Sequence, residues 1–354
     1  MRFAGRALLM AFAYAGTVVG AGFASGQEIL QFFTKYGKFA AGAILAASVL
    51  FVWLGTKSML LARRIGAKSY ADLNALLFGD AWGRRISGSM FILLMAVSSV
   101  MLAGAGSVLE QYAGLSYGTG LALTAAMVYA VILGGLSGIK AVNAVIVPLM
   151  FAFLAFVFAL TVQSPAAGHF LRYATDEPAW RLWLSPFLYA AFNLTLAQAV
   201  LAPLGASAPD DRTIRLAGFL GGGLIAVMLL FVHIALASRM PGIAQFDIPM
   251  GRIISPLGPP VRLFFALIVF AEIFSTLVAN LYGVTLQLSS RLPFSPRAIA
   301  AAVLLACAAV SRAGFKTLVS TLYPLIGALC LFWLIRLAKE RGKGNNGTNL
   351  VQEP

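Results

Sequence analysis

Near the start of the chain, an apolar segment is interrupted by Gly16-Thr17-Val18-Val19-Gly20-Ala21-Gly22-Phe23-Ala24-Ser25-Gly26-Gln27-Glu28. Apolar runs from Ala7 to Ala15 and from Ile29 to Phe33 flank the interruption, which places its polar groups at membrane depth. Glycine weakens a helix interior by roughly 1 kcal/mol relative to alanine, and polar groups in hydrocarbon cost more. Such a segment is stable where unwound backbone lines a cavity enclosed by protein. The stretch therefore predicts a discontinuous first membrane helix of the kind that forms substrate sites in secondary transporters.

The composition defines the broad class of protein. Of the 354 residues, 60% are hydrophobic and 11% are charged, whereas soluble domains carry about 25% charged residues. The chain is therefore expected to be a polytopic protein whose main partner is the lipid bilayer. The net charge of +14 comes from scattered Lys and Arg residues that form no basic stripe, so we expect no nucleic-acid partner.

The reactive residue types are isolated from one another. The cysteines, Cys307 and Cys330, lie in apolar segments, and the histidines, His169 and His233, have no metal-ligand spacing around them. This pattern predicts neither a disulfide framework nor a metal site nor a catalytic dyad. We therefore expect no enzymatic activity, no catalytic residue and no cofactor.

Apolar stretches long enough to cross a bilayer as a helix, about 20 residues each, recur along the whole chain. They cover roughly residues 8–33, 40–62, 86–111, 119–135, 141–162, 183–204, 213–237, 261–289, 297–311 and 317–337. Most of the 26 Lys and Arg residues lie inside when both termini are placed in the cytoplasm, as the positive-inside rule requires. The predicted location is a bacterial cytoplasmic (inner) membrane.

Five spans in each half turn the second half upside down relative to the first, which is the inverted-repeat geometry of many transporters. We expect an all-α polytopic membrane protein of about ten transmembrane helices in a 5+5 inverted repeat, with helices one and six discontinuous. The repeats would cover residues 1–162 and 183–337. Residues 163–182 would form an extracellular connection, and residues 338–354 a disordered cytoplasmic tail.

Two connections are predicted to be structured. Ser69-Tyr70-Ala71-Asp72 has the spacing of a capping box, which predicts a short cytoplasmic amphipathic helix before the third span. Residues 240–260 are rich in Pro and Gly but keep several large apolar side chains. That segment is expected either to pack over the bundle as a lid or to lie at the lipid interface.

The chemistry of the first break follows from its glycines. Gly20, Gly22 and Gly26 let the backbone leave the helical path, so that N–H groups face a ligand and carbonyls face a cation. A half-helix beginning near Ser25 would present its positive dipole end to an anionic group such as a carboxylate, and the Ser25 hydroxyl would bind that group or cap the half-helix. Tight packing of small residues between helices is the alternative explanation.

In the sixth span, Asn193, Thr195 and Gln198 lie amid apolar residues and are expected to form the paired break. The candidate substrate-binding residues are Gly20, Ala21, Gly22, Phe23, Ser25, Gly26, Gln27, Asn193, Thr195 and Gln198.

Two carboxylates are candidates for ion or proton coupling. Glu28 follows the break and would couple protons, bind a gate partner, or lie near the outer boundary beside Lys35 and Lys38. Glu272 lies about a third of the way into the eighth span, where a charged side chain costs at least a few kcal/mol unless it is paired or protonated. A satisfied structural carboxyl is the alternative for Glu272.

Three polar residues follow Glu272 on the same helix. Ser275, Thr276 and Asn280 stand at offsets of three, four and eight residues, which places them on one helical face. Their oxygens suit a hard cation such as Na+, and interhelical hydrogen bonding is the alternative role.

Gly20-Ala21-Gly22-Phe23-Ala24-Ser25-Gly26-Gln27-Glu28 closely resembles the first-helix signature of the YkvI-like bacterial membrane proteins. These are placed in the amino acid-polyamine-organocation (APC) superfamily of LeuT-type fold. The resemblance implies an amino-acid permease without naming the substrate. The remainder of the chain agrees with the family in span count, loop lengths and charge pattern.

The resemblance also implies a site. It assigns the substrate carboxylate to the backbone from Gly22 to Gly26, and further substrate contacts to the region from Asn193 to Gln198. A Na+ site would use carbonyls near Gly20 and Phe23 together with Ser275 and Thr276. Together with the polar residues considered above, the candidates for ion or proton coupling are Gly20, Phe23, Glu28, Glu272, Ser275, Thr276 and Asn280. Glu272 departs from the superfamily pattern, which raises protons as the alternative to Na+.

The sequence thus predicts a secondary active transporter, a symporter driven by Na+ or H+ that works by alternating access on an amino acid or related small zwitterion. No obligate protein partner is evident. The alternative is a membrane ligand sensor of the same fold that binds without transporting.

Overall fold

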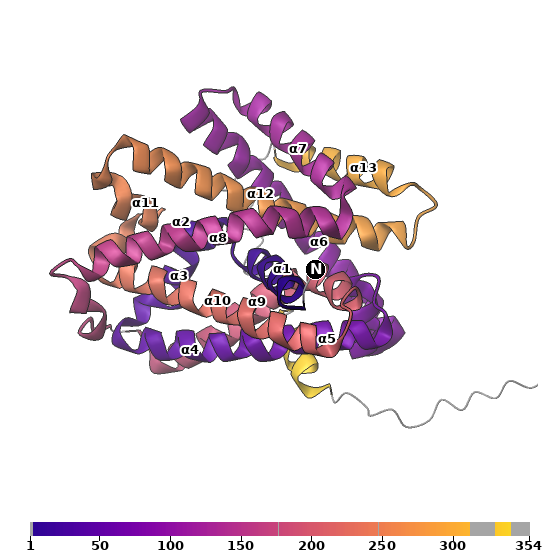
Figure 1. Ribbon diagram of the computed structural model, residues 1–354, viewed down its shortest axis with the longest axis horizontal. Coiled ribbons are helices and arrows are strands. Elements are labelled where there is room, and N and C mark those ends of the chain that lie inside the picture. The colour runs from indigo at the N-terminus through magenta and orange to yellow at the C-terminus, as the bar shows by residue number, and fades with distance from the viewer. Residues whose placement is uncertain (1–2, 176, 247, 312–329, 341–354) are drawn as a thin grey trace, which may run out of the picture.

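The computed structural model describes residues 3–175, 177–246, 248–311 and 330–340. Within these ranges the regular elements are all helices, which pack side by side with α1 near the centre (Figure 1). Six of the described helical stretches are long and apolar enough to cross a membrane, and three more are apolar but shorter. The protein is therefore an all-α polytopic membrane protein.

The helices of the first part follow the predicted spans. They are α1 (Phe3–Val18), α2 (Ala21–Ser25), α3 (Gln27–Phe32), η1 (Thr34–Phe39), α4 (Ala40–Leu50), the π-helical turn η2 (Phe51–Gly55), α5 (Thr56–Ile65), α6 (Tyr70–Ala113), α7 (Tyr117–Leu133) and α8 (Gly135–Val162). The first predicted span is thus divided among α1, α2 and α3, whereas α4, η2 and α5 follow one another without a gap. The preceding η1 contains a kink at Gly37 (φ 63°).

The later helices also lie where apolar runs predict them. They are η3 (Ala167–Leu171), α9 (Ala179–Ala206), α10 (Asp211–Ala237), η4 (Gly242–Gln245), α11 (Pro249–Ile254), η5 (Ser255–Leu257), α12 (Pro259–Ser289) and α13 (Pro296–Ser311). Residues 330–339 are helical and include residues 330–337 of the tenth predicted span. Residues 317–329 of that span lie outside the described ranges, as does the tail from residue 341. The start predicted for the disordered tail is wrong, because residues 338 and 339 continue the helix. The 5+5 repeat and its boundaries stay predictions.

The predicted break in the sixth span is wrong. Helix α9 runs for 28 residues without interruption, with Pro186 and Pro203 inside it. The Asn193 side-chain amide donates to the Tyr189 carbonyl one turn earlier at 3.0 Å, so it bonds to the helix instead of unwinding it. The residues around Asn193 include no glycine. The two prolines each remove one backbone hydrogen bond, but they lie toward the ends of α9 and not at its centre.

The short helix before the third span is confirmed as the first part of α6. Ser69 and Asp72 form the predicted capping box, and a left-handed Gly79 (φ 75°) separates this short helix from the long one. The Asn74 amide nitrogen donates to Ser87 Oγ at 3.0 Å, and Trp333 Nε1 donates to the Asn74 oxygen at 3.0 Å. The part of α6 before Gly79 is therefore bonded both to the long part of α6 and to the helix at residues 330–339.

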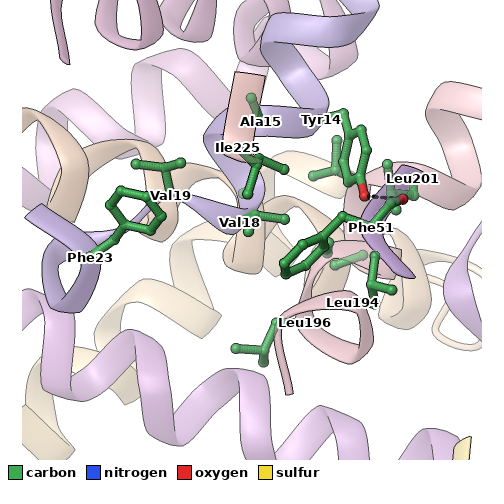
Figure 2. Close-up of a cluster of buried hydrophobic side chains, with 14 of the residues drawn as sticks. Tyr14, Ala15, Val18, Val19, Phe23, Phe51, Leu194, Leu196, Leu201 and Ile225 are labelled. Atoms are coloured by element: carbon green, nitrogen blue, oxygen red, sulfur yellow. Dashed lines mark hydrogen bonds between the residues drawn. The ribbon is translucent and has the colours of Figure 1, made fainter. Parts of the chain in front are cut away.

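The core is centred on the inner part of α1. Figure 2 shows Tyr14, Val18 and Phe23 among buried side chains of other helices, with the Tyr14 hydroxyl donating to the Phe51 carbonyl at 2.8 Å. That carbonyl lies at the start of the π-helical turn, where the regular helical bonding pattern changes. Gly16 also permits a close contact, since a Cβ atom there would lie 1.7 Å from Asn143 Oδ1 of α8. Close packing therefore holds α1 in place up to the break.

The segment between α10 and α12 packs onto the break. Met250 of α11 is fully buried, and its Cγ lies 2.8 Å from the position that a Cβ of Gly26 would occupy. Ile243 and Ile254 are buried as well, whereas Ile248 is half exposed. These contacts match the lid alternative for residues 240–260.

Candidate functional site

The first helix is interrupted at two points instead of one. Gly20 has an extended backbone (φ −135°, ψ −170°) between α1 and α2, and Gly26 has a left-handed backbone (φ 82°, ψ −4°) between α2 and α3. L-residues with a side chain rarely adopt the conformation of Gly26. The predicted half-helix therefore begins at Ala21, and not near Ser25. The five residues of α2 form a separate helical turn at the centre of the segment.

Backbone groups are left free on both sides of Gly20. Among the described residues, the N–H groups of residues 21–23 have no acceptor, and the carbonyls of residues 17–19 have no donor. Free N–H groups at a helix start attract anions, and free carbonyls at a helix end attract cations. The break thus presents both kinds of group within a few residues.

The carbonyls that the resemblance assigned to Na+ are already bonded. The Gly20 carbonyl accepts from the Ala24 N–H at 2.9 Å, and the Phe23 carbonyl accepts from the Gly26 N–H at 3.0 Å. Phe23 itself is fully buried in the core. A cation at the break would therefore find its free carbonyls one turn earlier, at residues 17–19.

Ser25 and Gln27 lie at the second interruption. The Ser25 hydroxyl donates to the Gly22 carbonyl at 3.0 Å and accepts from the Gln27 N–H at 3.3 Å. Of the two roles expected for Ser25, the structure therefore matches capping. The Gln27 side-chain oxygen is enclosed and has no hydrogen-bond partner among the described residues.

Glu28 folds back onto the break. Its carboxyl lies against Gly22, where a Cβ atom would be 2.2 Å from Glu28 Oε1 and 2.8 Å from its Cγ. The residue is half-buried, but its Oε2 is enclosed and has no hydrogen-bond partner among the described residues. Glu28 thus belongs to the candidate site and not to the outer boundary. Glycine at position 22 is needed to leave room for this carboxyl.

Tyr189 of α9 lies beside the Glu28 carboxyl. The ring of Tyr189 is fully buried, and its centroid lies 5.2 Å from that of Phe32, 5.0 Å from that of Phe33 and 5.9 Å from that of Phe51. No atom of the described residues meets the geometry of a hydrogen bond to the Tyr189 hydroxyl. Tyr189 is only a weak candidate from the sequence, because a single tyrosine in an apolar helix resembles ordinary core.

The polar residues of α9 point in different directions. Asn193 lies near the Tyr189 hydroxyl, on the side of the break. Thr195 instead lies beside Cys330, and the Gln198 amide nitrogen contacts the Met90 sulfur at 2.8 Å. The structure therefore brings Asn193 to the first break but places Thr195 and Gln198 against other helices.

Helix α12 faces the break from the other side. A Cβ atom at Gly20 would lie 3.0 Å from Thr276 Oγ1, so the Thr276 hydroxyl lies directly against the interruption. The Ser275 hydroxyl instead donates to the Glu272 carbonyl at 3.3 Å. Asn280 is buried, and its amide nitrogen has no partner among the described residues. Of the predicted cation ligands on α12, Thr276 is therefore the one that the structure places at the break.

Glu272 is fully buried within α12. Neither of its carboxyl oxygens has a hydrogen-bond partner among the described residues. It precedes Thr276 by one turn, so both side chains project from the same helical face. A carboxyl in such a place must be neutral or bind a cation, because an unpaired buried charge is costly.

A central helix broken beside a polar face of another helix is the architecture of LeuT-type membrane transporters, and solved structures confirm this fold. MhsT in complex with L-phenylalanine is similar with a TM-score of 0.72 and 16% identity, over 94% of this chain and 88% of that one. Mhp1, a nucleobase-cation-symport-1 family transporter, is similar with a TM-score of 0.66 and 16% identity, over 96% of this chain and 81% of that one. A Na+-coupled sialic acid symporter is similar with a TM-score of 0.66 and 13% identity, over 92% of this chain and 77% of that one.

Two proteins of Bacillus subtilis (strain 168) are similar in sequence over nearly their whole length. The membrane protein YkvI is 37% identical over 330 residues, which cover 93% of this chain and 94% of YkvI. YyaD is 25% identical over 325 residues, which cover 91% of this chain and 93% of YyaD. No family model matches the chain. The chain belongs to the YkvI family.

Proposed function

We propose that the protein is an ion-coupled secondary transporter that moves an amino acid or a related small zwitterion by alternating access. The observation that carries the proposal is the interruption at Gly20, where free N–H groups, free carbonyls and the Thr276 hydroxyl meet. These groups suit a small polar substrate together with a small cation. The ligands bound in two of the solved neighbours, L-phenylalanine and a hydantoin, are small organic molecules.

Two coupling ions are compatible with the site. Na+ would bind the carbonyls of residues 17–19 with Thr276 Oγ1, which is supported by the Na+ coupling named for the sialic acid symporter. A proton would instead reside on Glu272, which is buried and unpaired among the described residues. We favour Na+ at the break as the driving ion and assign Glu272 as the group that gives transport its pH dependence.

The proposal places the protein in a bacterial cytoplasmic membrane with both termini inside, as its charge distribution favours. In this proposal the site binds and moves a substrate. We propose no enzymatic reaction, no cofactor and no obligate protein partner.

The test is uptake of a labelled amino-acid panel into proteoliposomes, with Na+ and proton gradients imposed separately. Accumulation that follows one gradient is expected and would identify the coupling ion. Liposomes without protein, and vesicles in which the gradient has been collapsed, serve as controls. Saturable binding without accumulation under either gradient would refute transport and favour the sensor alternative.

A further inference from the structure

The carboxyl of Glu28 lies inside the candidate site. The substrate and Na+ sites implied by the resemblance give this carboxyl no role. We propose that this carboxyl binds the ammonium group of the substrate, so that the site selects organic ammonium compounds by their amino group and not by a carboxylate. The inference rests on the proposed function, since it names the chemical group that the same site recognises. It reassigns Glu28 from coupling to substrate recognition.

The first argument is the missing counter-charge. Among the described residues the ion pairs are Arg63–Asp211 and Arg181–Glu177, so no protein cation there neutralises Glu28. Its Oε2 is enclosed and has no hydrogen-bond partner in that part of the chain. An enclosed carboxyl must be neutral or bind a cationic partner. A cationic substrate group supplies that partner only when substrate is bound.

The second argument concerns the start of α2, which the resemblance assigned to a substrate carboxylate. The Glu28 carboxyl already lies against Gly22, in the first turn of α2. Negative groups at a helix start are stabilised by the free N–H groups there, and Glu28 provides such a group from within the chain. A substrate carboxylate at the same place would be repelled by it. A substrate amino group would be attracted.

The third argument is the chemistry around the carboxyl. The Tyr189 hydroxyl lies beside the Glu28 carboxyl, and its oxygen can accept a hydrogen bond from an ammonium N–H. Phe32 and Phe33 pack around the Tyr189 ring, and aromatic rings attract organic cations. A carboxylate, a hydroxyl and aromatic rings together fit an alkylammonium group.

The experiment uses compounds that share one side chain and differ only at the charged groups. L-Phenylalanine, phenethylamine and 3-phenylpropanoate form one series, and L-leucine, isoamylamine and 4-methylpentanoate form another. Binding to the purified full-length protein is measured by thermal stabilisation and by calorimetry, in Na+ and in K+ buffers. These readouts need no transport, so a protein that binds ammonium compounds but moves none of them would overturn the proposed function and leave this inference standing.

We expect the amino acid and the amine of a series to bind, and the deaminated acid to bind at least tenfold more weakly. Glu28→Gln should weaken amine binding at least tenfold, whereas Glu28→Asp, which keeps the charge, should recover part of it. The matched control is Glu110→Gln, the same change at an exposed position of α6. Its amine affinity should equal that of the unchanged protein.

Four results would overturn the inference. The first is a deaminated acid that binds as well as its amine. The second is a folded Glu28→Gln protein with unchanged amine affinity. The third is failure of every ammonium compound in both series to bind. If Glu28→Gln instead abolishes only the difference between Na+ and K+ buffers, Glu28 is an inorganic-cation ligand and the ammonium assignment is wrong.

Discussion

Replacing Gly26 by alanine tests the geometry on which the site depends. The backbone of Gly26 is left-handed, and a Cβ atom there would lie 2.8 Å from Met250 Cγ and 3.3 Å from Leu236 Cδ2. The left-handed conformation costs an L-residue about 1–2 kcal/mol, and overpacking adds about 1–3 kcal/mol. Gly26→Ala should therefore lower the free energy of unfolding by about 2–5 kcal/mol.

Two other glycines separate these contributions. Gly66 is also left-handed (φ 59°), but a Cβ atom there meets no atom of the described residues within 4 Å, so Gly66→Ala should carry only the conformational cost. Gly42 lies within α4 with similar open space, and Gly42→Ala should stabilise the helix by roughly 0.5–1 kcal/mol. Unfolding of the three variants would be followed in mixed micelles by circular dichroism as denaturant is added.

A double-mutant cycle with Met250→Ala identifies the contact itself. If α11 packs on Gly26 as described, the two substitutions should be non-additive, with a favourable coupling of about 0.5–3 kcal/mol, because the smaller side chain makes room for the new methyl group. The packing of α11 over the break would be refuted by two results together. Gly26→Ala would destabilise the protein no more than Gly66→Ala, and the effects of Gly26→Ala and Met250→Ala would be additive.

Four further substitutions probe the site itself. Gly22→Leu should abolish ligand binding while expression stays intact, since even a Cβ atom there would meet Glu28 Oε1 at 2.2 Å; retained binding in a titration would contradict this. Glu272→Gln should remove the pH dependence of uptake, and a transporter whose pH profile is unchanged would exclude Glu272 from coupling. Thr276→Val should raise the Na+ concentration for half-maximal uptake at least tenfold, about 1.4 kcal/mol. Ser275→Ala should change it little, because that hydroxyl bonds to its own helix, and equal effects of both variants would argue against the assignment.

The sequence allows the first break to be predicted because its physical signal is local. Glycines and polar groups in the middle of an apolar segment conflict with a continuous helix wherever the rest of the chain goes. Capping at Ser69 is predictable for the same reason, since the cap and its partner are three residues apart. The error in α9 has the opposite origin. Polar side chains there bond to their own helix or contact distant ones, and no local pattern distinguishes these cases from an unwound turn.

The position of Glu28 is likewise hidden in the sequence. Its carboxyl reaches Gly22 only because Gly26 turns the chain between them, and a continuous helix would have placed residues 22 and 28 on different faces. Ser275 and Thr276 are adjacent and equally polar, yet only Thr276 contacts the break. Such distinctions depend on the rotation of α12 against α1, which is set by the packing of the whole bundle.

The contrast between a segmented α1–α3 and an unbroken α9 has a mechanical consequence. The non-helical backbone at Gly20 and Gly26 separates α2 from α1 and α3, so α2 can change its orientation independently of both helices. Helix α9 has no such break over its 28 residues, although Pro186 and Pro203 each remove one backbone hydrogen bond within it. Changes in backbone conformation at the site are therefore expected at the two breaks of α1–α3, whereas α9 is expected to move as one longer unit.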